Sequence, residues 1–341
     1  MARHKQQRCW LKLPLIQRLK IQCYSLVLVV WVLIKYAFEL LWKSEKKRTE
    51  SWDRPPSCLI DNAIGYHSYV KLQGVKLHYV VVGDKNLPMA LLLHGFPDCW
   101  IGWRHQIKLL SESFRVFAID LKGFGDSDKP IWRTRYNVDV VINEIAELIN
   151  SMGYSKCTLI GHDLGAHIGW YFVTARPDLV VKFVAISCPH PNIFWDNIPV
   201  SSQFNSRWIQ FCQIPYFPEM EARKNNLAII DTLFNHLSVK REEKLKNAYK
   251  YVFSRSTDWT GPINYYRNLP FYRIKDDNKV EVPTMLILGN KDPLVKLESV
   301  VKSTEYVTKF ELKIVENSGH FPHQERPNDV NKFLLSFLTG L

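Results

Sequence analysis

The chain has 341 residues and a formal net charge of +12, and 46% of its residues are hydrophobic. This length is sufficient for one large domain with an insertion. Residues 1–50 carry eleven Lys or Arg against three acidic residues, a net charge of +8, which leaves only +4 for residues 51–341. The basic charge therefore belongs to the N-terminus, and the sequence gives no reason to expect a nucleic-acid surface.

The N-terminal segment has the composition of a membrane helix. Tyr24–Ile34 contains no charged residue, and Ile21–Trp42 holds twelve Leu, Ile, Val or Phe beside Lys35 and Glu39. These twelve contribute roughly −4 to −7 kcal/mol to insertion, against about +3 kcal/mol for a central lysine. Lys35 is off-centre and can pair with Glu39. We expect residues 1–50 to form a basic N-terminus with a single transmembrane anchor. A cleaved signal peptide is the alternative, but no small-residue cleavage site follows.

The sequence does not predict which way the N-terminal helix is oriented in the membrane, because Lys and Arg flank it on both sides. The seven cysteines have no paired spacing, and the chain contains no Asn-x-Ser/Thr sequon. Both features favour the reducing cytosol as the location of residues 51–341.

The rest of the chain alternates between strand-like and helical segments such as Val138–Asn150, which predicts an α/β fold with a mostly parallel sheet covered on both faces. The expected strands are Val75–Val82, Met89–His94, Phe114–Asp120, Cys157–Gly161, Lys182–Ser187, Thr284–Leu288 and Phe310–Glu316. Strand signals stop between Pro189 and about residue 270, where helix-compatible aromatic sequence takes over. We therefore predict a core of residues 51–188 and 271–341 with a helical insertion at 189–270.

Residues 161–165 read Gly-His-Asp-Leu-Gly, between a strand-like run and a helix-like one. A sharp strand-to-helix turn therefore carries Asp163, and this pattern resembles the nucleophile turn of the α/β-hydrolases. A carboxylate is already ionised at neutral pH, so it needs no base for its attack, and it suits displacement at a saturated carbon. We predict Asp163 as a nucleophile that forms an alkyl ester.

Hydrolysis of that ester requires a base that takes a proton from water. His320 follows the predicted strand 310–316, and Asp292 follows the predicted strand 284–288. Asp292 is placed to fix the tautomer of the histidine. The order Asp163, Asp292, His320 is the order of nucleophile, acid and histidine in α/β-hydrolases.

A second motif, His-Gly-Phe-Pro-Asp at residues 94–98, ends an earlier apolar run. In α/β-hydrolases the loop at this point supplies an oxyanion donor, so the resemblance implies that the backbone N–H groups of Phe96 and Leu164 form the pair. Pro97 permits a cis peptide bond.

Taken together, these motifs resemble the membrane-anchored epoxide hydrolases of the α/β-hydrolase fold, over roughly residues 60 to 341. Residues 123–127 (Gly-Phe-Gly-Asp-Ser) and 264–268 (Asn-Tyr-Tyr-Arg-Asn) also match. The resemblance implies that Asp163 opens an epoxide and that water activated by His320 and Asp292 releases a vicinal diol.

The same resemblance implies two lid tyrosines that donate to the leaving oxygen, within a helical lid at 189–270. Tyr266 matches the second. The first position falls on Trp208, whose indole N–H donates a hydrogen bond but delivers no proton. Tyr216 is a possible substitute. Trp103 is expected in the pocket wall, and Trp195 as ordinary packing.

We expect no cofactor and no metal. The expected partners are a lipophilic epoxide, of fatty-acid type or foreign, and the lipid bilayer. Lipid metabolism or detoxification at the endoplasmic reticulum, with the catalytic domain facing the cytosol, fits this chemistry.

Two alternatives stay open at this stage. A dehalogenase would use the same aspartate, but haloalkane dehalogenases usually place a tryptophan at the position of Leu164, and only Trp208 keeps a halide site conceivable. A weakly active or inactive membrane-bound relative would bind a lipid or partner protein. The missing lid tyrosine supports it, and the complete triad argues against it.

Overall fold

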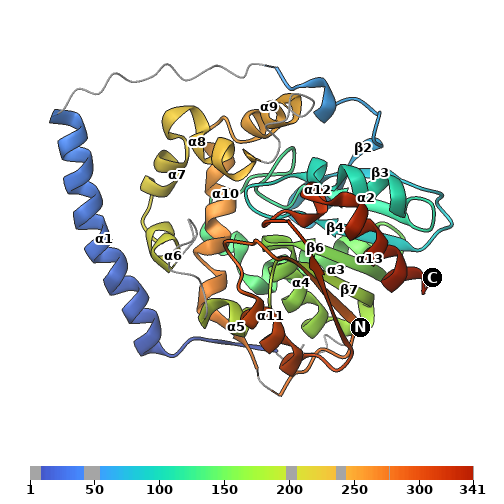
Figure 1. Cartoon of the computed structure of the whole chain (residues 1–341). Coiled ribbons are helices and arrows are strands. Elements are labelled where there is room, and N and C mark those ends of the chain that lie inside the picture. Colours follow the sequence, from blue (N-terminus) through green and yellow to red (C-terminus); the bar gives the residue numbers. More distant parts are fainter. Residues whose placement is uncertain (1–8, 42–53, 197–205, 236–242, 276, 341) are drawn as a thin grey trace.

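The computed structural model describes residues 9–41, 54–196, 206–235, 243–275 and 277–340 (Figure 1). Its core is an eight-stranded sheet with the strand order β10-β9-β7-β6-β4-β5-β3-β2. All neighbouring strands are parallel except β2 with β3 and β3 with β5, which are antiparallel. The strands are β2 (Tyr66–Leu72), β3 (Val75–Val82), β4 (Met89–Leu93), β5 (Arg115–Ile119), β6 (Cys157–His162), β7 (Val180–Ile186), β9 (Thr284–Gly289) and β10 (Phe310–Val315).

The predicted α/β fold is confirmed, and each of the seven predicted strands forms within two residues of its expected bounds. The central strands β4 and β6 are buried at every position. They have the near-continuous apolar sequence that a strand covered on both faces requires. β2 was not predicted, because its alternating polar residues and exposed edge position give a weaker signal.

Helices from both parts of the core cover the sheet (Figure 1). α3 (Val138–Ser151) packs on α4 (Leu164–Ala175), and α4 packs on β6 and β7. α13 (Pro327–Thr339) packs on α2 (Arg104–Leu110) and on α12 (Pro322–Glu325). α11 (Leu297–Lys302) follows β9. α4 is apolar around most of its circumference, because its residues 164–173 are all buried.

Helices occupy the predicted lid region, between β7 and the short strand β8 (Tyr272–Ile274). They are α5 (Pro191–Asp196), α6 (Ser206–Cys212), α7 (Phe217–Ala222), α8 (Lys224–Leu233), α9 (Glu243–Val252) and α10 (Thr257–Tyr266). α10 lies between the helices α6, α7 and α8 and the sheet (Figure 1). We propose 189–270 as the extent of the lid.

The N-terminal segment consists of a short strand and a long helix. β1 (Trp10–Lys12) pairs antiparallel with β8, and α1 (Leu15–Leu41) runs along the lid side of the molecule (Figure 1). Residues 15–38 of α1 are long and apolar enough to cross a membrane, and only 11% of the most apolar window is buried. The predicted helix is therefore present, whereas β1 and its pairing with β8 were not foreseen.

Candidate active site

Asp163 occupies the turn between β6 and α4 in a conformation that few non-glycine residues adopt, with φ 46° and ψ −114°. The flanking glycines allow this turn to pack closely. A Cβ at Gly165 would lie 2.2 Å from the carbonyl oxygen of Leu93, and one at Gly161 would lie 2.6 Å from the backbone N of Ala166. Replacement of either glycine would therefore push the turn away from β4 or α4. The strained turn holds Asp163 above the carboxyl end of the sheet.

The three predicted triad residues come together at this edge of the sheet. His320 Nε2 lies 3.6 Å from Asp163 Oδ1, and His320 Nδ1 lies 2.8 Å from Asp292 Oδ2. The other oxygen of Asp292 accepts hydrogen bonds from the backbone N–H groups of Leu294 and Val295, at 2.7 and 3.1 Å. Asp292 is thereby fixed in orientation, and it in turn orients the imidazole of His320.

The charges of the triad stabilise one another. Burial alone would raise the pKa of Asp163, but the neighbouring His320 ring and the N–H of Phe96 lower it to about 2. Burial alone would lower the pKa of His320, but the carboxylates of Asp292 and Asp163 raise it to about 10. At neutral pH the resting site therefore holds an imidazolium between two carboxylates.

One of the two predicted oxyanion donors already contacts the nucleophile. The backbone N–H of Phe96 donates to Asp163 Oδ2 at 2.9 Å, and the bond between Phe96 and Pro97 is cis. Leu164 is the first residue of α4, so its N–H belongs to the amides that open this helix. Leu164 as second donor stays a prediction.

A small cavity of about 20 Å³ lies over Asp163. Its walls come from the core loops and from lid helices, and they are mostly apolar. The lining residues are Phe96, Asp163, Phe194, Trp195, Ile209, Tyr266, Leu294 and His320. Tyr266 ends α10, is 8% exposed, and places its ring 5.3 Å from that of Phe96. Asp163, His320 and the predicted lid tyrosine Tyr266 thus share one cavity.

Other predicted residues lie elsewhere. Trp103 as pocket wall is wrong, because its fully buried ring packs on His323, 4.7 Å away, and does not line the cavity. Tyr216 as a lid donor is also wrong in this structure, because its side chain is 78% exposed. Trp208 is half-buried and stacks on Phe96 at 6.3 Å, beside the lining residue Ile209. Trp195, expected as ordinary packing, lines the cavity.

Comparisons with known proteins agree with this geometry. Residues 90–209 match the family model described as alpha/beta hydrolase fold. The chain is 37% identical over 321 residues to Epoxide hydrolase 4 of Homo sapiens, covering 89% of this chain and 88% of that protein. It is 36% identical to Epoxide hydrolase 3 of Xenopus tropicalis, covering 83% and 80%.

This chain belongs to the epoxide hydrolases of the α/β-hydrolase fold. Among solved structures, the epoxide hydrolase of Bacillus megaterium in complex with an inhibitor is 30% identical, with a TM-score of 0.71. The match covers 80% of this chain and all of that one. The epoxide hydrolase VrEH1 of Vigna radiata is 27% identical, with a TM-score of 0.68 over 82% of this chain and all of that one. The enzyme is therefore a hydrolase that acts on epoxides.

The epoxide hydrolase site has a supporting carboxylate that sequence reasoning missed. Glu325 accepts hydrogen bonds from Ser318 Oγ at 3.2 Å and from the backbone N–H groups of Gly319 and Phe321, at 2.6 and 3.0 Å. These bonds hold the loop on both sides of His320. An acidic residue five positions after the histidine, at the end of α12, is the only sequence signal for it.

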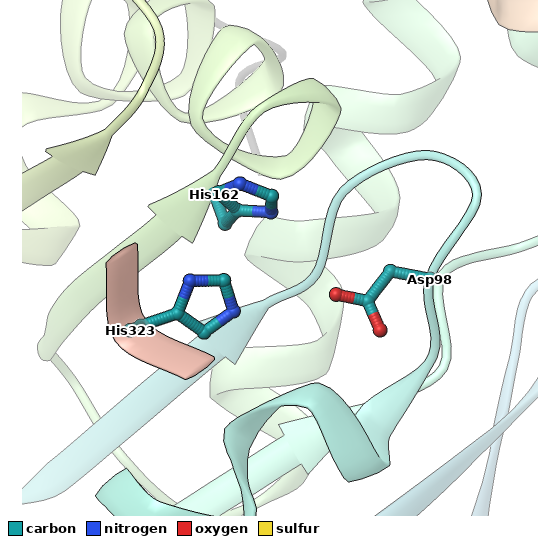
Figure 2. A group of neighbouring side chains, drawn as sticks. All are labelled: Asp98, His162 and His323. Carbon is teal, nitrogen blue, oxygen red and sulfur yellow. The ribbon is translucent and has the colours of Figure 1, made fainter. Parts of the chain in front are cut away.

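Asp98, His162 and His323 form a buried cluster (Figure 2), and His162 directly precedes the nucleophile Asp163. Its potential ligand atoms lie within 4.8 Å of one another, so it could hold a cation. However, His162 Nε2 already pairs with the carbonyl oxygen of His320 at 2.8 Å. The Asp98 carboxylate likewise accepts bonds from the N–H of Cys99 and from Gln324 Nε2, at 2.7 and 3.2 Å. These bonds suit a support for the His320 loop.

Proposed function

We propose that this enzyme converts lipophilic epoxides, such as fatty-acid epoxides, to vicinal diols through a covalent ester on Asp163. The observation that carries the proposal is the position of the Asp163 carboxylate. It faces an apolar cavity between His320 Nε2 and the N–H of Phe96, with Tyr266 in the same wall. An ionised carboxylate in such a cavity can attack the saturated carbon of an epoxide.

In the first half-reaction an oxygen of Asp163 bonds to an epoxide carbon, and the bond from that carbon to the epoxide oxygen breaks. Tyr266 donates its proton to the alkoxide that forms. Burial, reinforced by the charge of Asp163, raises the pKa of Tyr266 well above its usual range, so the hydroxyl keeps its proton until the alkoxide develops. The phenolate of Tyr266 regains a proton from the His320 imidazolium through solvent.

In the second half-reaction neutral His320 takes a proton from water, and the hydroxide attacks the ester carbonyl of Asp163. Esterification makes this possible, because it removes one of the two negative charges that keep His320 protonated. The N–H groups of Phe96 and Leu164 stabilise the tetrahedral oxyanion. The bond from the ester carbonyl carbon to the alkyl oxygen then breaks, and that oxygen takes the proton of His320, so the diol leaves. The carboxylic acid left on Asp163 gives its proton to His320, which restores the resting carboxylate and imidazolium.

Tyr266 is the principal acid in this scheme. Trp208 does not line the cavity, although its ring stacks on Phe96. We therefore propose no acid role for Trp208, since an indole N–H does not deliver a proton.

We further propose that the catalytic domain faces the cytosol at the endoplasmic reticulum and acts in lipid metabolism or detoxification. All seven cysteines are free thiols, which suits a reducing compartment. A helix as apolar as α1 places the enzyme where lipophilic epoxides partition.

Trapping of the intermediate tests the mechanism. The His320→Gln variant should form the ester on Asp163 but not hydrolyse it, so intact-mass spectrometry should show one molecule of epoxide added per chain. Peptide mapping should locate the added mass on Asp163. An unmodified His320→Gln protein after incubation with a substrate of the unaltered enzyme would contradict the covalent scheme.

A further inference from the structure

Both ends of α1 connect to the catalytic domain. Before the helix, Trp10 of β1 pairs with Ile274 of β8, and the N–H of Leu13 donates to the carbonyl oxygen of Phe271 at 2.8 Å. α1 begins two residues after Leu13. After the helix, the described chain resumes at residue 54 and continues into the main sheet through β2.

A helix that crosses a bilayer once places the segments before and after it on opposite sides of the membrane. α1, with 27 residues, is about 40 Å long, enough for a hydrocarbon core of about 30 Å. However, a crossing would separate β1 from β8, to which it is hydrogen-bonded, and would expose the buried ring of Trp10, which packs edge-on against Tyr171 at 5.8 Å. The pairing of β1 with β8 is therefore incompatible with a single crossing by α1.

The middle of α1 is also attached to the lid. Ser25 Oγ donates to the carbonyl oxygen of Gln210 in α6 at 3.0 Å. Lys35 Nζ and Tyr36 OH donate to the two oxygens of Glu221 in α7, at 3.0 and 3.1 Å. Ser25 and Tyr36 are eleven residues apart, so these contacts occupy about 16 Å of the helix. In a crossing helix, the charged groups of α7 would lie at the depth of the hydrocarbon, which is costly.

The remainder of the α1 surface is apolar and exposed. Six large side chains between the two lid contacts are each 50% to 68% exposed: Leu26, Val27, Val30, Trp31, Leu33 and Ile34. A continuous apolar surface of this kind is unusual on a protein in water and typical of a helix that lies in a membrane interface. The exposed basic side chains of Lys12 and Lys20 lie near its first turns, where they can contact anionic lipid headgroups.

We propose that α1 does not cross the bilayer but lies in the plane of one leaflet, with the lid on one face and lipid on the other. Both ends of the helix then stay on the side of the catalytic domain. The lid becomes the membrane-facing part of the enzyme, and α6 lies between α1 and the cavity, because Gln210 contacts α1 and its neighbour Ile209 lines the cavity. This placement holds whether or not Asp163 forms an ester.

Sidedness in sealed microsomes tests the placement on the full chain. Leu11→Cys, at a 58% exposed position, and Ile131→Cys, at a 62% exposed position of the catalytic domain, are introduced separately into a Cys23→Ser background. The background chain corrects for labelling of the native thiols by a membrane-impermeant maleimide. We expect the two introduced thiols to show the same ratio of labelling before detergent to labelling after it. A ratio near one at one position and near zero at the other would overturn the proposal.

Vesicle binding tests the lipid contact. Val27→Lys with Ile34→Lys places two charges on the apolar face and should lower sedimentation of the purified chain with phosphatidylcholine and phosphatidylserine vesicles by at least about tenfold. Gln17→Lys with Gln22→Lys, at exposed polar positions of the same helix, is the matched control and should bind like the unaltered chain. Equal binding by both variants, or an unaltered chain that ignores vesicles and dimerises through α1, would contradict the proposal.

Discussion

The strand-to-helix turn at Asp163 and the helical lid both contribute to the cavity, but different kinds of structure position their side chains. The turn is part of the sheet, and its backbone geometry is set by two glycines and by contacts with β4 and α4. The lid contributes Trp195, Ile209 and Tyr266 from three separate helices, α5, α6 and α10. The position of the nucleophile Asp163 therefore depends on local backbone geometry. The position of the proposed proton donor Tyr266 depends on packing between segments that are far apart in the sequence.

Because the attack depends on the carboxylate of Asp163, its loss should lower the rate of diol formation more than any other change to the site. Asp163→Asn removes the nucleophile but keeps its shape, so the rate of diol formation should fall by on the order of 10⁴-fold or more. Turnover is measured with a fatty-acid epoxide, and the circular dichroism spectrum should stay unchanged. Slow return of activity on storage would indicate deamidation to aspartate. Prompt activity close to that of the unaltered enzyme would place the nucleophile outside the turn.

The lid donor should matter less than the nucleophile. Tyr266→Phe removes the proposed acid from the cavity and should lower the rate of ester formation by about 10²- to 10³-fold, as measured in a single turnover. Tyr216→Phe is the matched control and should change the rate less than about twofold, because that side chain is 78% exposed. A large effect of Tyr216→Phe with a small effect of Tyr266→Phe would show that the lid rearranges around the substrate.

A substitution at Glu325 separates the two half-reactions within the core side of the site. Glu325→Gln weakens the bonds that hold the His320 loop and should slow ester hydrolysis by about ten- to a hundredfold, because bonds to a charged group contribute about 1.5–3 kcal/mol. Ester formation should stay within about threefold, since Asp163 is held by other contacts. Rapid-quench kinetics separates the two steps. Equal slowing of both steps would assign Glu325 a general role in stability.

The pH dependence of stability tests the charge arrangement of the triad. The pKa of His320 in the folded protein, about 10, lies above that of a free histidine, so its proton stabilises the fold fully below about pH 6.5 and this stabilisation is lost as the pH rises toward 10. In Asp163→Asn one of the two carboxylates is absent. The pKa of His320, followed by NMR, should fall, and the decline in Tm between pH 6.5 and 10 should become smaller. An identical decline in both proteins would contradict the coupling of His320 to Asp163.

Sequence alone predicts the parts of the enzyme that depend on local backbone. Asp163, Asp292 and His320 each follow a strand of the sheet, and the carboxyl ends of parallel strands meet at one edge, so their proximity follows from topology. The position of Phe96 near Asp163 is predictable for the same reason, since the loop that carries Phe96 follows β4.

The parts that depend on long-range packing are not predictable in this way. No sequence pattern separates the environments of Trp103 and Trp195, yet Trp103 packs on His323 in the core and Trp195 lines the cavity. Tyr216 has a positive φ of 65° just before α7, which directs the chain differently from a continuous helix. β1 and β8 have three residues each and lie far apart in sequence, so no periodic pattern reveals their pairing.

The most direct test of the covalent mechanism is a single turnover in water enriched in ¹⁸O, with the full-length enzyme in excess over a fatty-acid epoxide. The oxygen added to the diol should be unlabelled in the first turnover, because it comes from the Asp163 carboxylate, and the label should appear in that carboxylate. A first-turnover diol that carries ¹⁸O, with none in Asp163, would show direct attack by water and contradict the ester intermediate.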